Sequence, residues 1–317
     1  MKDVSELFGV RYPIIQGGMA WIANYHLASA VSNGGGLGLI AAGSADAAFV
    51  KGQIEKTREL TDKPFGVNVM LMNPHVDEIM RMLAEEKVAV VTTGAGNPGK
   101  YMSMLKDAGI RVCPVVASVA LAIRLARGGA DAIIAEGTEA GGHIGELTTM
   151  ALIPQIADAV GIPVVAAGGI ADGRGIAAAY MLGAKGVQVG TAFLVAEECQ
   201  IAQAYKDMIL KARDTDTVAT GRSTGHPVRV LKNRMSKDVL SLEKQGIDPE
   251  EFENRMAGTL RAAVVDGDVV NGSVMSGQIA GMVKREETAA KIIEKMFREA
   301  NDIYENRHTL FGAGRAI

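Results

Sequence analysis

The sequence of 317 residues lacks the features that mark several classes of protein. It has two cysteines, Cys113 and Cys199, with no Cys-x-x-Cys or histidine-rich spacing, which disfavours a disulfide scaffold and a metal site such as zinc. No uncharged apolar run approaches the roughly 18 residues that span a bilayer, and residues 1–6 lack the apolar core of a signal peptide. A net charge of −3 disfavours nucleic acid or anionic membranes as the main partner. These absences predict a cytoplasmic protein.

What the sequence has is glycine, 38 residues of it, and short apolar runs bounded by turn residues. Such runs are typical of strands buried on both faces of a parallel sheet. They occupy residues 13–16, 37–40, 65–69, 88–91, 112–116, 132–135, 163–167 and 186–189. Helical patterns lie between them, on Phe49, Ile54 and Leu60, over 76–83, over 120–126 and over 175–182. This alternation predicts an α/β fold, a (β/α)8 TIM barrel.

The pattern changes after the eighth predicted strand. Residues 200–274 are charged and predicted to be helical, with no further buried strand, while residues 286–297 have the amphipathic pattern of a last barrel helix. We therefore expect a cofactor-binding barrel made of residues 1–199 and 275–317, with residues 200–274 as a smaller, mostly helical insertion. This insertion would be a lid over the carboxyl ends of the strands or, alternatively, a dimerisation element.

The most informative segment is residues 136–145, Glu-Gly-Thr-Glu-Ala-Gly-Gly-His-Ile-Gly. Glu136 follows the sixth predicted strand, and glycines then surround His143. Glycine lets the backbone come close to a planar ligand, and histidine titrates near neutral pH, so this histidine is a candidate to give or take a proton. The alternative is a glycine-rich loop with an ordinary surface histidine.

The last two predicted strands end in residues suited to a phosphate. Gly168 and Gly169 follow the seventh strand, and Gly190 and Thr191 follow the eighth. Loops at these positions of a barrel commonly bind phosphate through backbone N–H groups, and the threonine hydroxyl adds a donor. The alternative is two tight turns with no ligand.

Polar or glycine-rich residues also follow the other strands. Gly17, Gly18 and Met19 come after the first, Asn68 after the third and residues 92–97 after the fourth. Met19 would pack against a flat ring, unless it is plain core. No Gly-x-Gly-x-x-Gly follows a strand in the Rossmann manner, so a Rossmann nucleotide site is not indicated. A flat cofactor with one phosphate, FMN, fits this pattern.

At these residues the chain resembles the FMN-dependent enoyl-[acyl-carrier-protein] reductases of bacterial type II fatty-acid synthesis. That group lies within the nitronate monooxygenase (2-nitropropane dioxygenase) superfamily. The similar segments are residues 12–20, 64–68, 91–98, 135–145, 166–172, 188–191 and 272–281. Three of them resemble the reductase branch: Thr-Thr-Gly-Ala-Gly-Asn-Pro, His-Ile-Gly and Gly-Ser-Val-Met-x-Gly-Gln.

The resemblance implies a set of site residues. His143 matches the family's active-site histidine, and Met275 and Gln278 would lie near the ring and the mouth of the pocket. FMN would be held by Gly17, Gly18, Met19, Asn68, Glu136, Gly141, Gly142, Gly168, Gly169, Gln188, Gly190 and Thr191. Family members are usually homodimers, and some respond to a monovalent cation, for which no ligand set is visible here.

The resemblance also implies an activity, the reduction of trans-2-enoyl-[acyl-carrier-protein] to acyl-[acyl-carrier-protein] with NADH or NADPH. This is the last step of the fatty-acid elongation cycle, and the sequence does not choose between the two nucleotides. One alternative is a nitronate monooxygenase that oxidises nitroalkanes or nitronates with FMN and O2. Another is a flavin-binding barrel without catalysis.

The implied protein partner, acyl-carrier protein, is acidic. A stretch of the predicted insertion carries cations and no acid: Arg222, Arg229, Lys232, Arg234 and Lys237. Such a patch suits an acidic partner and would weaken with salt, although ordinary charge scatter on a solvated surface is the alternative. His226, within this stretch, is expected to be a packing or surface residue.

Overall fold

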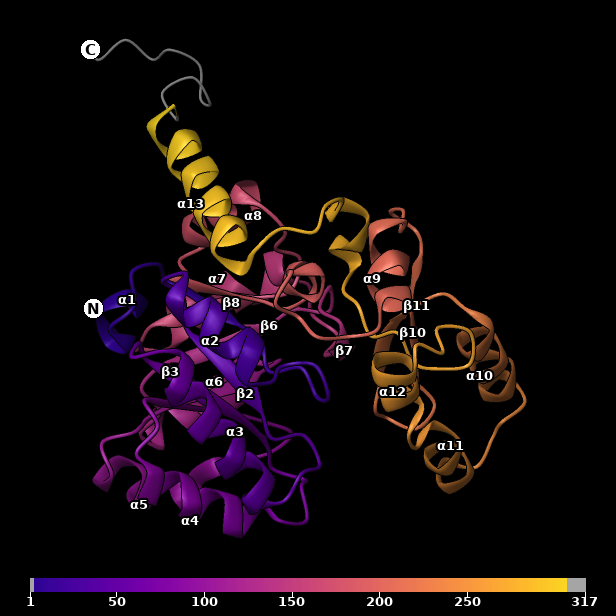
Figure 1. Cartoon of the computed structure of the whole chain (residues 1–317), viewed down its shortest axis with the longest axis horizontal. Helices are drawn as coiled ribbons and strands as arrows, with labels where there is room; N and C mark the ends of the chain where they lie inside the picture. Colours follow the sequence, from indigo (N-terminus) through magenta and orange to yellow (C-terminus); the bar gives the residue numbers. More distant parts are fainter. Residues whose placement is uncertain (1–2, 307–317) are drawn as a thin grey trace.

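The computed structural model describes residues 3–306, and eight parallel strands alternate with helices in it (Figure 1). The strands are β1 (Ile14–Gln16), β2 (Gly38–Ala41), β3 (Phe65–Met70), β4 (Val90–Gly94), β5 (Arg111–Val116), β6 (Ile133–Glu136), β8 (Val164–Ala167) and β9 (Gly186–Val189). Their order is β1-β9-β8-β6-β5-β4-β3-β2. A parallel bridge between Ile15 and Leu37 closes β2 onto β1, so the predicted (β/α)8 barrel is confirmed.

The inside of the barrel is filled with apolar side chains. This cluster includes Ile15, Leu37, Leu39, Val90, Cys113, Ile134 and Val165. The short helix α1 (Val4–Phe8) adds Val4 and Phe8 to it, and Val4 lies against Gly186 at the start of β9. The amino ends of the strands are therefore covered, which leaves the carboxyl ends for a ligand.

Helices cover the outside of the barrel. They are α2 (Tyr25–Asn33), α3 (Ala47–Leu60), α4 (Val76–Glu86), α5 (Met102–Asp107), α6 (Val119–Arg127), α7 (Thr149–Ala159) and α8 (Gly173–Met181), with a 3-10 turn at Pro98–Tyr101. Side chains of Asn24, Asp46, Ser118 and Asp172 cap four of them. In α3 only Ile54 of the predicted apolar residues is buried, because Phe49 and Leu60 lie on the outer face.

The amphipathic segment near the C-terminus forms α13 (Ala289–Glu305), which lies beside α8 and α2 (Figure 1). Its Phe297 ring stacks on Tyr12 with 4.9 Å between ring centres. Gly173 of α8 lies directly against the backbone of Ala300, where a Cβ would come within 2.4 Å. The prediction of a last barrel helix is confirmed. The ends of the two predicted barrel segments, residues 1–2 and 307–317, lie outside the described residues.

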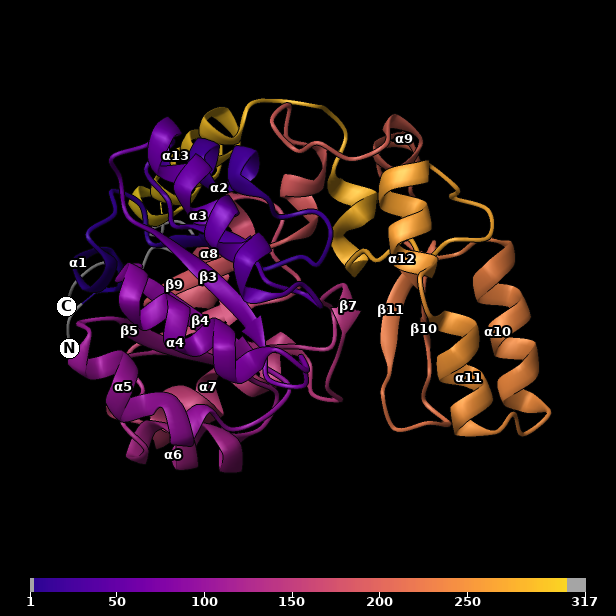
Figure 2. The same ribbon diagram turned by 60° about the horizontal axis from the view of Figure 1, so that its bottom comes forward.

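The inserted segment lies to one side of the barrel (Figure 2). It contains α9 (Gln203–Leu210), β10 (Thr217–Thr220), β11 (Val228–Leu231), α10 (Arg234–Lys244), α11 (Pro249–Met256) and α12 (Thr259–Arg261), followed by a π turn over Ala262–Asp266. The expectation of no further buried strand is wrong, because Val230 and Leu231 of β11 are buried. β10 and β11 pair antiparallel, and β7 (Gly142–His143) joins them as a third strand.

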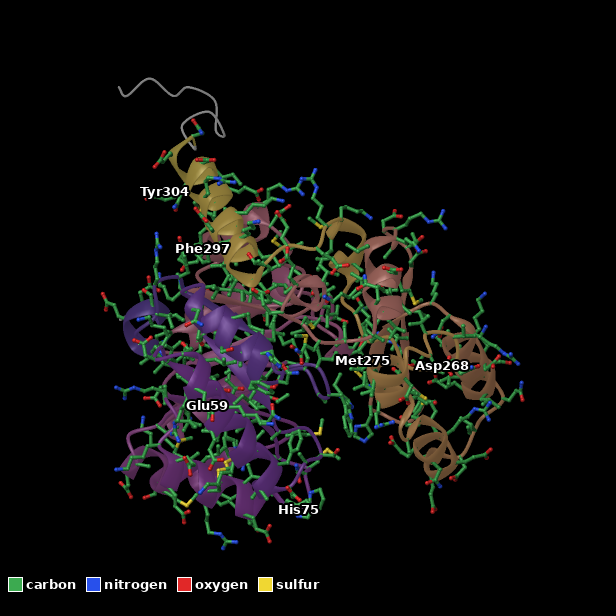
Figure 3. All side chains as sticks on the ribbon, in the orientation of Figure 1. Glu59, His75, Asp268, Met275, Phe297 and Tyr304 are labelled. Carbon is green, nitrogen blue, oxygen red and sulfur yellow. The ribbon has the colours of Figure 1, made fainter. Side chains whose placement is uncertain are left out.

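Several bonds attach the insertion to the barrel. The Tyr205 hydroxyl donates to the Met275 carbonyl at 2.7 Å, and Lys206 Nζ donates to the Ala196 carbonyl at 2.8 Å. Lys206 also pairs with Glu286 at 3.2 Å. Met275 lies where the insertion meets the barrel (Figure 3). Within residues 3–306, none of the helices has both the length and the apolar character that crossing a membrane requires.

Candidate active site

A cavity of about 700 Å³ opens at the carboxyl ends of the barrel strands. Residues that follow the strands form most of its wall, and Leu260, Met275, Gly277 and Ile279 complete it. The predicted site residues that line it are Gly17, Gly18, Met19, Asn68, Glu136, Gly141, Gly142, His143, Gly168, Gly169, Gln188, Gly190, Thr191 and Met275. The structure thus brings them together in one place, while their role as cofactor ligands stays a prediction.

Gln278 is the predicted site residue that the structure places elsewhere. It begins the 3-10 turn Gln278–Met282 and is exposed outside the cavity. Its backbone N–H donates to the Glu139 carbonyl at 2.9 Å, and the Gly277 N–H donates to Thr191 Oγ1 at 2.9 Å. The segment is therefore held against the cavity wall through its backbone, which turns this side chain away from the ligand space.

The glycines of the cavity are of two kinds. Gly18 and Gly141 are packed against neighbours, since an added Cβ would lie 2.2 Å from Asn68 Cβ and 2.7 Å from Gly277 N. At Gly17 and Gly190 a Cβ would meet nothing closer than 3.7 Å and 3.6 Å. Protein packing therefore does not require glycine at these two positions. A ligand that approaches the backbone closely would require it, so this part of the cavity wall, here called the cradle, is open to such a ligand.

The ends of β8 and β9 form one end of this cradle. Gly168 and Gly169 have φ of 90° and 75°, a left-handed turn that favours glycine. Thr191 Oγ1 accepts from Gly277, so its own hydrogen remains available to a ligand. The Glu139 carboxylate lies 3.5 Å from where a Cβ of Gly169 would be, and it accepts from the backbone and hydroxyl of Thr149 at 2.9 Å each. This carboxylate caps α7, which fixes the loop beside the turn.

Glu136 ends β6 with its carboxyl group in the cavity. Burial raises the pKa of this carboxyl from 4.5 to about 7. The side chain keeps partial contact with solvent through the cavity. Near neutral pH the group is therefore divided between its protonated and ionised forms, and it can donate or accept a hydrogen bond there.

His143 lies on β7, opposite Val228 of β11. The Ile144 N–H donates to the Pro227 carbonyl at 3.0 Å, which fixes the strand that bears the histidine. The imidazole is open to the cavity, yet the surrounding walls desolvate it and lower its pKa; His226 lowers the pKa further, and Glu253 opposes this. These walls therefore favour the neutral ring, which has one nitrogen as donor and the other as acceptor. His226 is exposed, as expected.

The structure corrects the predicted basic patch in part. Arg229 is buried, and its Nε donates to the Thr138 carbonyl at 3.0 Å, so it joins the insertion to the barrel loop and is no surface charge. Arg222 pairs with Glu146 of the barrel at 2.6 Å, and Arg234 lies 3.8 Å from Asp238. The remaining cations, Lys232 and Lys237, are exposed.

The cavity also has residues that were absent from the predicted site, among them Trp21, Met72, Glu139 and Leu260. Trp21 and Met72 lie on loops after β1 and β3, and both are exposed at the cavity wall. Glu139 lies inside the predicted histidine segment, so its place near the site was predictable from the sequence. Its role as the cap of α7 was not. Leu260 comes from the insertion, and no motif marks it.

Comparisons with known proteins agree with this fold. The structure of FabK from Thermotoga maritima superimposes with a TM-score of 0.94 at 46% identity, covering 97% of this chain and 99% of that chain. A probable nitronate monooxygenase of Staphylococcus aureus is 33% identical over 95% of this chain and 98% of its own. The (3aS,4S,5R,7aS)-5-hydroxy-7a-methyl-1-oxo-octahydro-1H-indene-4-carboxyl-CoA dehydrogenase of Mycobacterium tuberculosis is 34% identical over 94% and 95%. The nitronate monooxygenase family model matches residues 2–299, and the chain belongs to this family of oxidoreductases.

Proposed function

We propose that the protein is an FMN-dependent enoyl-[acyl-carrier-protein] reductase that uses NADH or NADPH. The observation that carries this is the 46% identity to FabK over nearly the whole chain, against 33% to the probable nitronate monooxygenase of similar coverage. The segments that resemble the reductase branch supply cavity residues, among them Gly94, His143 and Met275. The M. tuberculosis relative is named for a CoA thioester, which also favours thioester chemistry.

The cavity suits FMN. The turn at Gly168 and Gly169, with the Thr191 hydroxyl, would hold the phosphate, and the open backbone at Gly17 and Gly190 would lie against the sugar chain and ring. Asn68 Nδ2 donates to Thr92 Oγ1 at 2.9 Å, which leaves its carbonyl oxygen for the ligand. When bound, FMN supplies the hydride-transfer chemistry, and the chain supplies position and electrostatics.

His143 would act on the thioester. Reduction places negative charge on the thioester oxygen, and a neutral imidazole N–H is a donor for it. The lowered pKa favours this role over that of a permanently charged acid, because desolvation disfavours the protonated ring. Glu136, divided between its two forms near neutral pH, is a second group that can hold a proton at the cavity wall.

The test is NADH and NADPH oxidation by the FMN-loaded protein, with and without crotonyl and longer enoyl thioesters. Oxidation that depends on the enoyl thioester supports the reductase. Anaerobic mixing with NADH or NADPH adds a second measurement, since rapid bleaching of the flavin absorbance is expected. If neither nucleotide bleaches the flavin, while a nitronate causes O2 consumption, the monooxygenase named among the relatives is the function and the proposal is wrong.

We propose acyl-carrier protein as the partner, docked on the exposed cations of the insertion, with a homodimer as the assembly. Because Arg229 is buried, the exposed cations of the patch are Arg222, Lys232, Arg234 and Lys237. Contacts between exposed charges weaken with salt, so KM for an enoyl-[acyl-carrier-protein] should rise with ionic strength. KM for the small crotonyl thioester should not. Equal salt dependence for both substrates would exclude this docking surface.

A further inference from the structure

Two residues from distant parts of the chain meet at the mouth of the cavity. Trp21, the only tryptophan, follows β1, lines the cavity and is 53% exposed. Arg261 ends α12 in the insertion, and its guanidinium carbon lies 5.9 Å from the centre of the Trp21 ring. This distance is within the range of a cation–π contact. The pair therefore bridges the barrel and the insertion beside the opening.

The backbone of Trp21 is in a conformation that side chains rarely adopt. Its φ is 66°, in the left-handed region. The turn is held by the Met19 carbonyl, which accepts from Ile22 N at 3.0 Å and from Ala23 N at 2.9 Å. A strained backbone that presents an exposed aromatic ring has no benefit for packing. Such strain is concentrated at ligand sites, so the ring is placed for a ligand.

Arg261 supplies a second flat group with spare donors. Its side chain is 49% exposed, and within residues 3–306 its guanidinium makes one hydrogen bond, to Asp266 at 3.1 Å. The rest of the planar fork is free for a phosphate, which it can bind with two parallel bonds. An aromatic ring stacks on any nucleobase. Together the two groups match a base that carries phosphates.

The proposed substrates require such a site. A nicotinamide nucleotide has to place its nicotinamide inside the cavity, and its adenosine phosphate end then extends through the mouth. We propose that Trp21 and Arg261 bind the adenosine phosphate of a nucleotide substrate at the cavity mouth. This rests on the proposed function for NADH or NADPH, and a coenzyme A thioester presents the same chemistry.

Kinetics of the FMN-loaded protein test the site through Trp21→Leu and Arg261→Gln. Loss of a stacked base or a paired phosphate should raise KM for NADH or NADPH about tenfold, with kcat and FMN affinity unchanged. Trp21→Phe keeps a ring, and Arg255→Gln removes an exposed arginine of α11. Both controls should behave as wild type. If KM is unchanged in Trp21→Leu and Arg261→Gln for every substrate, the inference is overturned.

Thioester substrates separate the two sources of the adenosine phosphate. A rise in KM for crotonyl-CoA, without a rise for the crotonyl pantetheine thioester, supports the same site and assigns it to coenzyme A. An equal rise for both thioesters shows that the pair contacts the acyl chain, which overturns the inference.

Binding without turnover distinguishes failure of this site from failure of the proposed function. The emission of Trp21 reports on the site alone, because the chain has no other tryptophan. ADP should change this emission in the FMN-loaded protein, and Arg261→Gln should need about tenfold more ADP. A response to ADP in a protein that oxidises neither nucleotide would reject the reductase and keep the site. No response to ADP overturns the site.

Discussion

Two parts of the cavity wall are built from different groups. The side at the ends of β8 and β9 presents glycine backbone and the Thr191 hydroxyl, which do not change charge near neutral pH. Another part of the wall is β7, paired with β11, and it presents His143 with His226 and Glu253 near it. On the proposed function, the ligand is held by the first group of residues, and His143 acts on it from a different part of the chain. Substitutions should therefore affect one role and spare the other.

The largest expected effect is that of His143→Ala. Loss of a positioned donor should lower kcat with an enoyl thioester about a hundredfold to ten-thousandfold. FMN affinity, measured by flavin fluorescence, should stay close to wild type because the cradle is made of other residues. His75→Ala, at an exposed histidine before α4, is the matched control and should leave both quantities unchanged. A parallel loss of FMN affinity in His143→Ala would show that His143 also holds the cofactor, contrary to this expectation.

Gly190→Ala tests the cradle. The new Cβ would meet only Met19 Sδ at 3.6 Å, so the fold should be retained. If FMN approaches this backbone, its Kd should rise about tenfold or more through overpacking. Gly52→Ala, at an open position on α3, controls for the loss of a glycine. Wild-type FMN affinity in Gly190→Ala would place the ligand elsewhere.

Glu136→Gln separates a charge effect from shape. The carboxyl has a folded pKa of about 7 against 4.5 ordinarily, so below pH 4.5 it is protonated in both folded and unfolded chains. Between 4.5 and 7 the unfolded chain ionises first, and stability falls as pH rises. Allowing for solvent at this partly exposed group, the loss is about 1–2 kcal/mol above pH 7. Urea unfolding of the FMN-free protein should find Glu136→Gln more stable than wild type at pH 8, with a smaller difference at pH 4. No pH dependence of that difference would contradict the raised pKa.

The smallest effect concerns the neighbours of His143. Because His226 lowers the pKa of His143 and Glu253 raises it, His226→Gln should shift the acid limb of the kcat profile to higher pH. Glu253→Gln should shift it to lower pH. Both shifts should be a few tenths of a pH unit, as for partly screened charges. Shifts of the same sign would show that the two residues act through the fold and not through charge.

The sequence predicted the parts of the molecule in which local pattern and tertiary place agree. The strand at 65–69 was visible because both of its faces are buried, as in β3. β11 was missed because Arg229 interrupts its apolar residues, and its partner β7 has only two residues. Because this strand was not predicted, the burial of Arg229 within it was not predicted either.

The site residues divide in the same way. Glycines and polar residues that directly follow a barrel strand converge at one end of the barrel by topology, so their meeting was predictable. For residues that follow the insertion, barrel topology does not predict which of them reach the cavity. Met275 reaches the cavity, whereas Gln278, three positions later, is directed outward by the turn that it begins.

The pairing of β7 with β11 involves only two residue pairs, Val228 with His143 and Arg229 with Gly142. The strand that bears His143 is thus joined to the insertion by a short strand pairing. Changes within the insertion can alter what faces the ligand without disturbing the strands that would hold it. This offers a physical reason why relatives named for a CoA dehydrogenase and for a nitronate monooxygenase share similar identity with one barrel: such a scaffold can diversify its chemistry by exchanging one wall.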